Sequence, residues 1–126
     1  MVKLDHLVIR VKNHAASRDW YVRHFGFKIE FEAGPKATAL QDDAGLTMFV
    51  ETSDEVNPRS CMMFFQVDDV EEKYRELRAR GIEFIVAPQK NFWGYGAELL
   101  DPDGYKIGLW DEKSMNRHMA EEKKHT

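Results

Sequence analysis

The sequence predicts an α+β fold made of two tandem βαβββ modules, with a cleft where the modules meet. The first observation is an internal repeat, because residues 6–31 and 62–86 share the order strand, helix, glycine-containing turn and strand. An offset of 56 residues places Val11 on Val67. The second observation is turn chemistry, because a glycine follows each predicted helix and a DPDG tetrapeptide joins the last two predicted strands. A unit present only twice is typical of two similar halves, not of a solenoid.

The first predicted strand, residues 4–11, has the period-two alternation of a half-buried strand. One face is fully apolar and should meet a helix, whereas the other is partly polar and should face a cavity or solvent. The apolar face holds Leu7, Ile9 and Val11. The partly polar face holds His6, Val8 and Arg10.

A helix is predicted over residues 14–25, because Asn13 is a favourable N-cap residue and Gly26 can take a left-handed conformation. Its buried side is expected to hold Ala16, Trp20 and Phe25. Turn residues then separate three short apolar runs, each of which predicts a strand. These strands are expected at 27–32, 38–41 and 46–51.

The second half repeats this order after a predicted linker at residues 57–60. Its helix should begin after Asp69, which has capping-box spacing to Glu72, and end at Gly81. The buried stripe of this helix is expected to be Val70, Tyr74 and Leu77. The elements are predicted as a strand at 61–67, a helix at 70–80 and strands at 82–86, 95–100 and 105–110, with a loop at 87–92.

Size and composition indicate one domain with a proper core, since the chain has 126 residues, 43% of them hydrophobic. We expect this domain to span residues 1–112, with modules at about 3–52 and 61–111. A polar tail at 113–126 should be a frayed, solvated helix or a disordered end, in which His118 and His125 are surface residues.

Charge and apolar content exclude several partners. A net charge of −4 offers no broad positive field, so we expect no nucleic acid partner. The apolar runs are too short to cross a bilayer and no signal segment is evident, so we expect a soluble cytoplasmic protein with no membrane partner. The single cysteine, Cys61, fits a reducing compartment and is expected to be a small core residue.

Two consecutive βαβββ units, a glycine after each helix and the ending DPDGYKIGLW resemble the vicinal oxygen chelate superfamily. This superfamily holds glyoxalase I, extradiol dioxygenases, fosfomycin-resistance enzymes and bleomycin-resistance binding proteins. The resemblance covers residues 3–111 and implies curved mixed sheets around a cleft. It also implies a homodimer, in which the modules pair either within one chain or between two chains.

The resemblance implies where a metal would be held, because metal-using members take ligands from inward positions of the first and last strand of each half. Those positions correspond to His6, Phe49, Met62 and Gly108. Only His6 carries a donor of the usual kind for a divalent transition metal, so we expect no metal cofactor. If a metal is bound, the alternative ligand set is His6, Glu51 and Glu98.

The inward faces predicted by alternation form an aromatic groove with a few polar groups. The expected ligand-binding residues are His6, Arg10, Phe49, Glu51, Met62, Phe64, Trp93, Tyr95, Glu98 and Trp110. Planar ligands suit such a groove, since stacking adds about 0.5–1.5 kcal/mol per aromatic pair, and the carboxylates would favour a cationic group. The glycines beside Trp93 and Tyr95 are expected to leave room for a ligand or for the other half.

A structural role for the same residues is the alternative. The aromatic side chains could pack against each other or against a second subunit. Arg10 is expected to pair with Glu51, because an isolated buried charge is costly. His6 is expected to bond to a backbone carbonyl if it is a core residue.

The leading functional hypothesis is a protein that binds and sequesters an aromatic small molecule, with or without a positive charge, in the manner of the bleomycin-resistance proteins. No bond is made or broken in this hypothesis. The competing hypothesis is a glyoxalase-like lyase, isomerase or dioxygenase with an altered metal shell, in which Glu51 or Glu98 moves a proton. A third is a regulatory or scaffolding module.

Overall fold

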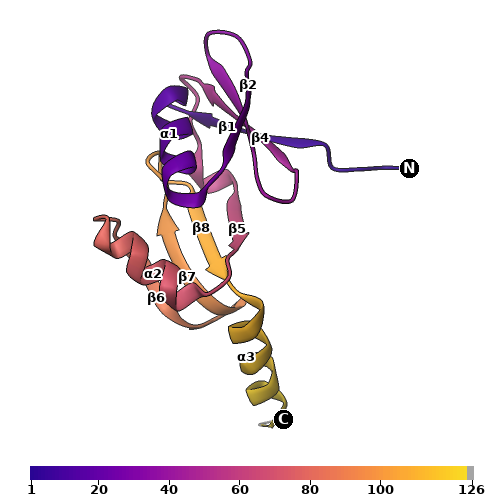
Figure 1. Cartoon of the computed structure of the whole chain (residues 1–126), viewed down its shortest axis with the longest axis vertical. Coiled ribbons are helices and arrows are strands. Elements are labelled where there is room, and N and C mark those ends of the chain that lie inside the picture. The colour runs from indigo at the N-terminus through magenta and orange to yellow at the C-terminus, as the bar shows by residue number, and fades with distance from the viewer. Residues whose placement is uncertain (125–126) are drawn as a thin grey trace. The chain divides into compact units, whose positions relative to one another are not determined.

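The computed structural model describes residues 1–124. The chain divides into two compact units, Met1–Asn57 and Pro58–Thr126, each with a four-stranded mixed sheet. The boundary falls within the predicted linker at 57–60. Both units follow the order strand, helix and three strands, so the predicted tandem βαβββ fold is confirmed (Figure 1).

The first unit contains β1 (His6–Val11), α1 (His14–Phe25), β2 (Lys28–Glu32), β3 (Ala37–Gln41) and β4 (Thr47–Thr52). Its sheet order is β1-β4-β3-β2. The β1 strand is parallel to β4, whereas the other neighbours are antiparallel. The parallel pair is possible because α1 and the two following strands provide a long crossover between β1 and β4.

The ends of α1 are those that the sequence predicted. The Asn13 side chain accepts a hydrogen bond from the Ala16 amide, and Gly26 is left-handed with φ of 68°. The predicted buried side of this helix is wrong, because Ala16 is exposed and Trp20 and Phe25 are only half-buried. The buried side chains are Ser17, Tyr21 and His24. Two of these three are polar, so hydrophobicity alone did not identify the buried stripe.

The second unit contains a short 3₁₀ turn (Pro58–Ser60), β5 (Met62–Gln66), α2 (Val70–Ala79), β6 (Phe84–Asn91), β7 (Gly94–Leu100), β8 (Lys106–Trp110) and α3 (Glu112–Lys124). The sheet order is β5-β8-β7-β6, with β5 parallel to β8. Two side-chain devices that the sequence predicted are present. Asp69 accepts from the Glu72 amide at the start of α2, and the Asp101 carboxylate accepts from the Asp103 and Tyr105 amides in the β7–β8 turn.

Two expectations for the second unit are wrong. Residues 87–91 belong to β6, although Pro88 favoured a loop there. The β6 strand lies at the sheet edge and its pairing with β7 is irregular, which are the places where a strand tolerates proline. Cys61 is exposed and not a core residue, because β5 begins one residue later, at Met62.

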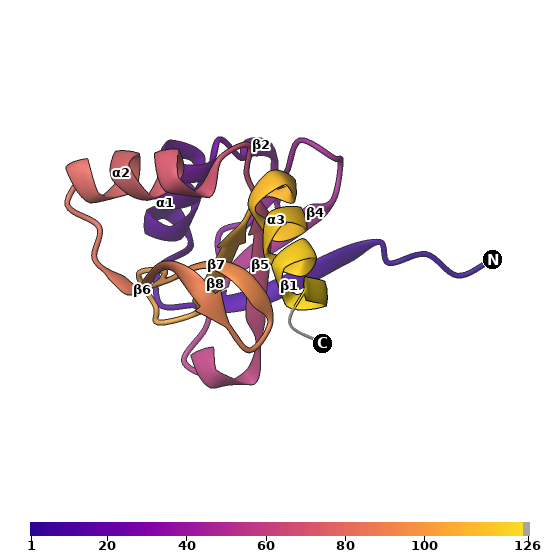
Figure 2. The same ribbon diagram turned by 90° about the horizontal axis from the view of Figure 1, so that it is seen from below.

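One helix covers one face of each sheet (Figures 1 and 2). In the first unit, α1 lies beside the strands whose alternate residues Ile9, Val11 and Val50 are buried. In the second unit, α2 packs on β6 and β7 through Val70 and Leu77, which are fully buried, as predicted. The half-buried Tyr74 ring packs edge-on against Phe84 at 4.8 Å. The second unit has a further helix, α3, which also packs against β7.

The Asp111 carboxylate joins the beginnings of two helices and is 2% exposed. Its Oδ2 accepts from the Val70 amide at the start of α2, at 2.6 Å. Its Oδ1 accepts from the Ser114 amide in the first turn of α3, also at 2.6 Å. One side chain therefore caps both helices of the second unit.

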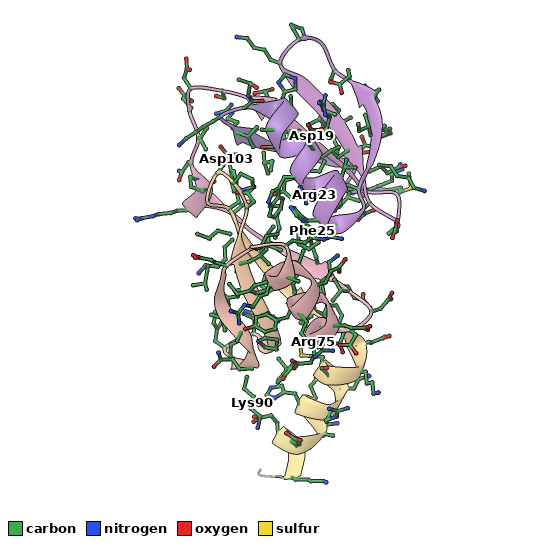
Figure 3. All side chains as sticks on the ribbon, turned by 60° about the vertical axis from the view of Figure 1, so that its left-hand side comes forward. Asp19, Arg23, Phe25, Arg75, Lys90 and Asp103 are labelled. Carbon is green, nitrogen blue, oxygen red and sulfur yellow. The ribbon has the colours of Figure 1, made fainter. Side chains whose placement is uncertain are left out.

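The polar tail is helical over its described part and packs against the second unit. The Met115 thioether lies where a side chain on Gly94 would be. Lys90 of β6, which is labelled in Figure 3, is 3.6 Å from Glu121 of α3. His118 lies on this helix and is half-buried, whereas His125 lies outside the described residues. Among the described residues, no helix has the length and apolar character needed to span a membrane.

Replacing Asp111 with alanine should destabilise the second unit, because two helix starts each lose a hydrogen-bond acceptor. We expect the free energy of unfolding to fall by about 2 kcal/mol, roughly one per cap, in a urea titration followed by circular dichroism. Asp43→Ala, in the exposed turn after β3, is the matched control and should change the free energy of unfolding by less than about 0.5 kcal/mol. Equal effects of the two substitutions would contradict the capping role.

The contribution of the Asp111 carboxylate to the free energy of unfolding should depend on pH. Burial alone would raise the pKa of Asp111, but hydrogen bonds from Ser114 and Val70 and the charge of Arg117 outweigh burial and lower it. A folded pKa below the unfolded one stabilises the fold above the unfolded value of about 4, and this contribution is lost as the pH falls through the folded pKa. The difference in free energy of unfolding between the wild type and Asp111→Ala should therefore become smaller as the pH is lowered. A difference that grows would contradict this assignment.

Candidate functional site

The uncovered face of the first sheet contains the residues that alternation predicted. Register pairs His6 with Thr47, Val8 with Phe49 and Arg10 with Glu51. These side chains therefore share one face, and Val8 remains 51% exposed. We call this surface the first open face.

Phe49 lies at the centre of the first open face. Its ring meets the His6 ring edge-on at 5.1 Å and the Phe31 ring edge-on at 5.7 Å. Sequence reasoning missed Phe31, because the β2 register shifts between Ile29 and Phe31 and simple alternation fails there. Phe31 is 48% exposed, so an aromatic surface faces solvent in this unit.

The charged groups of the first open face are largely paired with each other. Arg10 lies 3.9 Å from Glu51, as predicted, and donates a hydrogen bond of 3.3 Å to Glu55, which the sequence did not indicate. The His6 side chain is 45% exposed and its Nδ1 lies 3.0 Å from the Asp5 carboxylate, so His6 is not the core histidine bonded to a backbone carbonyl that was the structural alternative. The hydrogen bond from His6, with the charges of His6 and Lys3, lowers the pKa of Asp5 against the opposing effect of burial. A proton on Nδ1 would leave Nε2 as the acceptor.

The face of the second sheet opposite α2 is also defined by register. Phe64 and Glu98 both pair with Gly108, and Gln66 pairs with Trp110. Met62 shares this face, because it lies two residues before Phe64 on β5. We call this surface the second open face.

Two glycines allow aromatic rings to lie directly on the backbone of the second open face. A Cβ on Gly108 would lie 2.8 Å from the Phe64 ring, and a Cβ on Gly96 would overlap the Trp93 indole. The two rings meet edge-on, with centroids 5.0 Å apart and an interplanar angle of 80°. The room that Gly94 and Gly96 leave is thus filled by Met115 and Trp93 of the same unit.

The buried carboxylate of Glu98 fixes this aromatic pair. Glu98 is 6% exposed and its Oε2 accepts a hydrogen bond of 2.9 Å from the Trp93 indole nitrogen. The Lys106 ammonium lies 3.7 Å from Oε1, within ion-pair range but beyond an ordinary hydrogen bond. The indole is therefore held in place before any ligand arrives.

Tyr95 does not belong to the second open face. Its hydroxyl donates a hydrogen bond of 2.8 Å to Glu71 of α2, on the helix-covered side of the sheet. That hydrogen bond, with burial and nearby acidic charge, raises the pKa of Tyr95. The expectation that Tyr95 lines the groove with Trp93 is not met, because strand alternation places it opposite Gly96 and Glu98.

The side chains at the four inward positions do not fit a divalent metal of the usual kind. In the first unit, His6 provides one imidazole and Phe49 provides no donor. In the second unit, Met62 offers a thioether and Gly108 offers no side chain. The alternative ligands are engaged elsewhere, Glu51 near Arg10 and Glu98 with Trp93. Among the described residues, no three histidine, cysteine, aspartate or glutamate side chains gather as a metal-holding group.

Known proteins with this architecture show what the chain is similar to. A possible glyoxalase from Bacillus cereus aligns with a TM-score of 0.74 at 19% identity, covering 86% of this chain and 98% of that one. TnmS3, an antibiotic binding protein from Streptomyces sp. CB03234, aligns with a TM-score of 0.73 at 23% identity, covering 87% and 96%. A glyoxalase/bleomycin resistance protein/dioxygenase from Alicyclobacillus acidocaldarius aligns with a TM-score of 0.66 at 22% identity, covering 86% of this chain and 90% of that one. At these identities the likeness concerns the fold alone.

Sequence comparison gives the family directly. No curated protein matches the chain. A family model does match, over residues 3–109, which is most of the chain. The protein therefore belongs to the Glyoxalase/Bleomycin resistance protein/Dioxygenase superfamily.

Proposed function

We propose that this protein binds and sequesters a planar aromatic small molecule and performs no chemistry on it. The observation that carries the proposal is the Phe64–Trp93 pair on the second open face, with ring centroids 5.0 Å apart. Phe64 is 47% exposed, so its ring is accessible to a ligand. Offset or edge-on stacking on such rings adds about 0.5–1.5 kcal/mol per pair beyond simple burial.

Preorganisation supports binding at this surface. The hydrogen bond to Glu98 and the glycine beneath the ring fix the Trp93 indole in one orientation. A side chain that is already ordered loses little conformational entropy when a ligand arrives, so more of the stacking energy appears as affinity. The first open face supports the same ligand class, because Phe31 and Phe49 present a second edge-on pair in that unit.

Similarity to an antibiotic binding protein supports binding as the function, since TnmS3 has the same fold. In the proposal, the ligand is an antibiotic-like aromatic compound, and the protein acts as a homodimer in the cytoplasm without a metal cofactor. The side chains support the proposal that no metal cofactor is used. Three of the four positions that would hold a metal are Phe49, Met62 and Gly108, which carry no donor of the usual kind.

A metal-dependent lyase, isomerase or dioxygenase is the second candidate, and one observation favours it. His6 is bonded to the Asp5 carboxylate, an arrangement that commonly orients a metal-binding imidazole. The neighbouring inward position, Phe49, supplies no second ligand in this unit. We therefore rank this candidate below binding.

Titration with aromatic compounds tests the proposal. We expect saturable quenching of tryptophan fluorescence with at least one member of a panel of planar aromatics and bleomycin-type glycopeptides. Calorimetry with that compound should show binding weakened about 3- to 10-fold by Trp93→Leu, because one stacking partner is lost. Trp20→Phe on α1 is the matched control and should leave the affinity unchanged, since Trp20 packs against Tyr21 and Phe25. Equal weakening by both substitutions would contradict the site.

Elemental analysis separates the two candidates. Protein purified without chelator should contain far less than one transition metal ion per chain, and His6→Ala should not change that content. Stoichiometric metal that disappears in His6→Ala would overturn the proposal and favour the enzyme. Arg10→Ala is a suitable control, because Arg10 shares the first open face with His6 and cannot bind a metal cation.

A further inference from the structure

We infer that the second open face selects ligands carrying a positively charged amine, and that Lys106 competes with such ligands for Glu98. This inference rests on the proposed function, because it concerns the same aromatic surface. It adds the charge of the ligand and assigns a specificity-determining role to two residues.

Glu98 is the first element of the argument. Its side chain is 7% exposed, so its charge has been taken largely out of water. A buried carboxylate is tolerated when hydrogen bonds and an opposite charge compensate for the lost hydration. Among the described residues, one hydrogen bond, from the Trp93 indole at 2.9 Å, reaches Oε2, and the Lys106 ammonium lies 3.7 Å from Oε1. At this distance Lys106 is a charged neighbour of Oε1 but not an ordinary hydrogen-bond donor to it.

Lys106 is the second element. Its side chain is 48% exposed, and a long lysine side chain at this exposure can move into water at little cost. The 3.7 Å separation is longer than a charge-assisted hydrogen bond, which is typically about 2.7–2.9 Å. An amine on a bound ligand could approach Oε1 more closely than Lys106 does, and would then replace it.

The aromatic rings are the third element. The nitrogen edge of the Trp93 indole is bonded to Glu98, and the Phe64 ring meets Trp93 at 80°, so both rings lie beside the carboxylate or beside its partner. A cation placed over an indole face gains from the ring quadrupole, most strongly when it is desolvated. A neutral aromatic compound gains the stacking alone, and an anionic one is repelled by Glu98.

A matched set of three naphthalene compounds tests the inference by calorimetry at pH 7. The compounds are 2-naphthylmethylamine, which is cationic, 2-naphthylmethanol, which is neutral, and 2-naphthoate, which is anionic. For the wild type we expect the amine to bind about tenfold more tightly than the alcohol, and the naphthoate to bind most weakly. Glu98→Gln should remove the preference for the amine, because glutamine retains an acceptor for the Trp93 indole but lacks the charge.

Lys106 provides the sharper comparison. Lys106→Gln should tighten binding of the amine about threefold or more and leave the alcohol unchanged, because the internal competitor is gone. Lys113→Gln, an exposed lysine on α3, is the control and should affect neither. Circular dichroism of each variant checks that the fold is retained.

The outcomes distinguish this inference from the proposed function. Equal affinity for the amine and the alcohol in the wild type, tightest binding of the naphthoate, or weaker amine binding in Lys106→Gln would overturn the inference and leave aromatic binding intact. Failure of all three compounds and of the wider aromatic panel would overturn both.

Discussion

In each four-stranded sheet one face packs against the helix that follows the first strand of its unit, and this constraint places the candidate binding residues on the opposite face. In the first unit, the face beside α1 buries Ile9, Val11 and Val50. In the second unit, the face beside α2 buries Leu99, Ile107 and Leu109. Because side chains alternate along a strand, the residues between these positions lie on the opposite face. Aromatic and charged side chains gather there, and these are the groups that can recognise a small molecule.

The second unit couples its stability to the shape of its open face. Asp111 caps α2 and α3, and α3 places Met115 against Gly94 in the β6–β7 hairpin. Trp93 occupies the same hairpin, where its amide donates to the Asn91 side chain and its indole donates to Glu98. The C-terminal helix is therefore part of the support for the aromatic surface. A truncation within α3 would expose the hairpin whose geometry orients Trp93.

The sequence was sufficient to predict features that depend on local pattern. Alternation placed His6, Phe49 and Phe64 on the faces opposite the helices, and capping residues located the starts of α1 and α2. Sequence pattern failed where the strand register shifts and where polar residues occupy the buried side of a helix. The shift in β2 brings Phe31 to Phe49, and the polar residues Ser17 and His24 occupy the buried side of α1.

Contacts made by flexible side chains were also beyond sequence reasoning. The 3.3 Å bond from Arg10 to Glu55 joins positions that no periodicity relates. The placement of Trp93 over Gly96 depends on the conformation of the hairpin loop. The glycines were recognised as sites of close approach, but the group that approaches could not be derived from pattern. Tyr95 was assigned to the groove because it adjoins Trp93 in sequence, whereas its hydroxyl bonds to Glu71 on the other face.

The central claim is that a ligand binds against the Trp93 indole on the second open face. The most direct measurement is a two-dimensional ¹⁵N–¹H NMR spectrum of the indole N–H groups, recorded while a binding aromatic compound is added. The indole resonance of Trp93 should shift progressively and saturate, because a ligand ring lies against it and alters its hydrogen bond to Glu98. The resonance of Trp20 should stay in place. Saturable binding that moves Trp20 and leaves Trp93 unchanged would contradict the account.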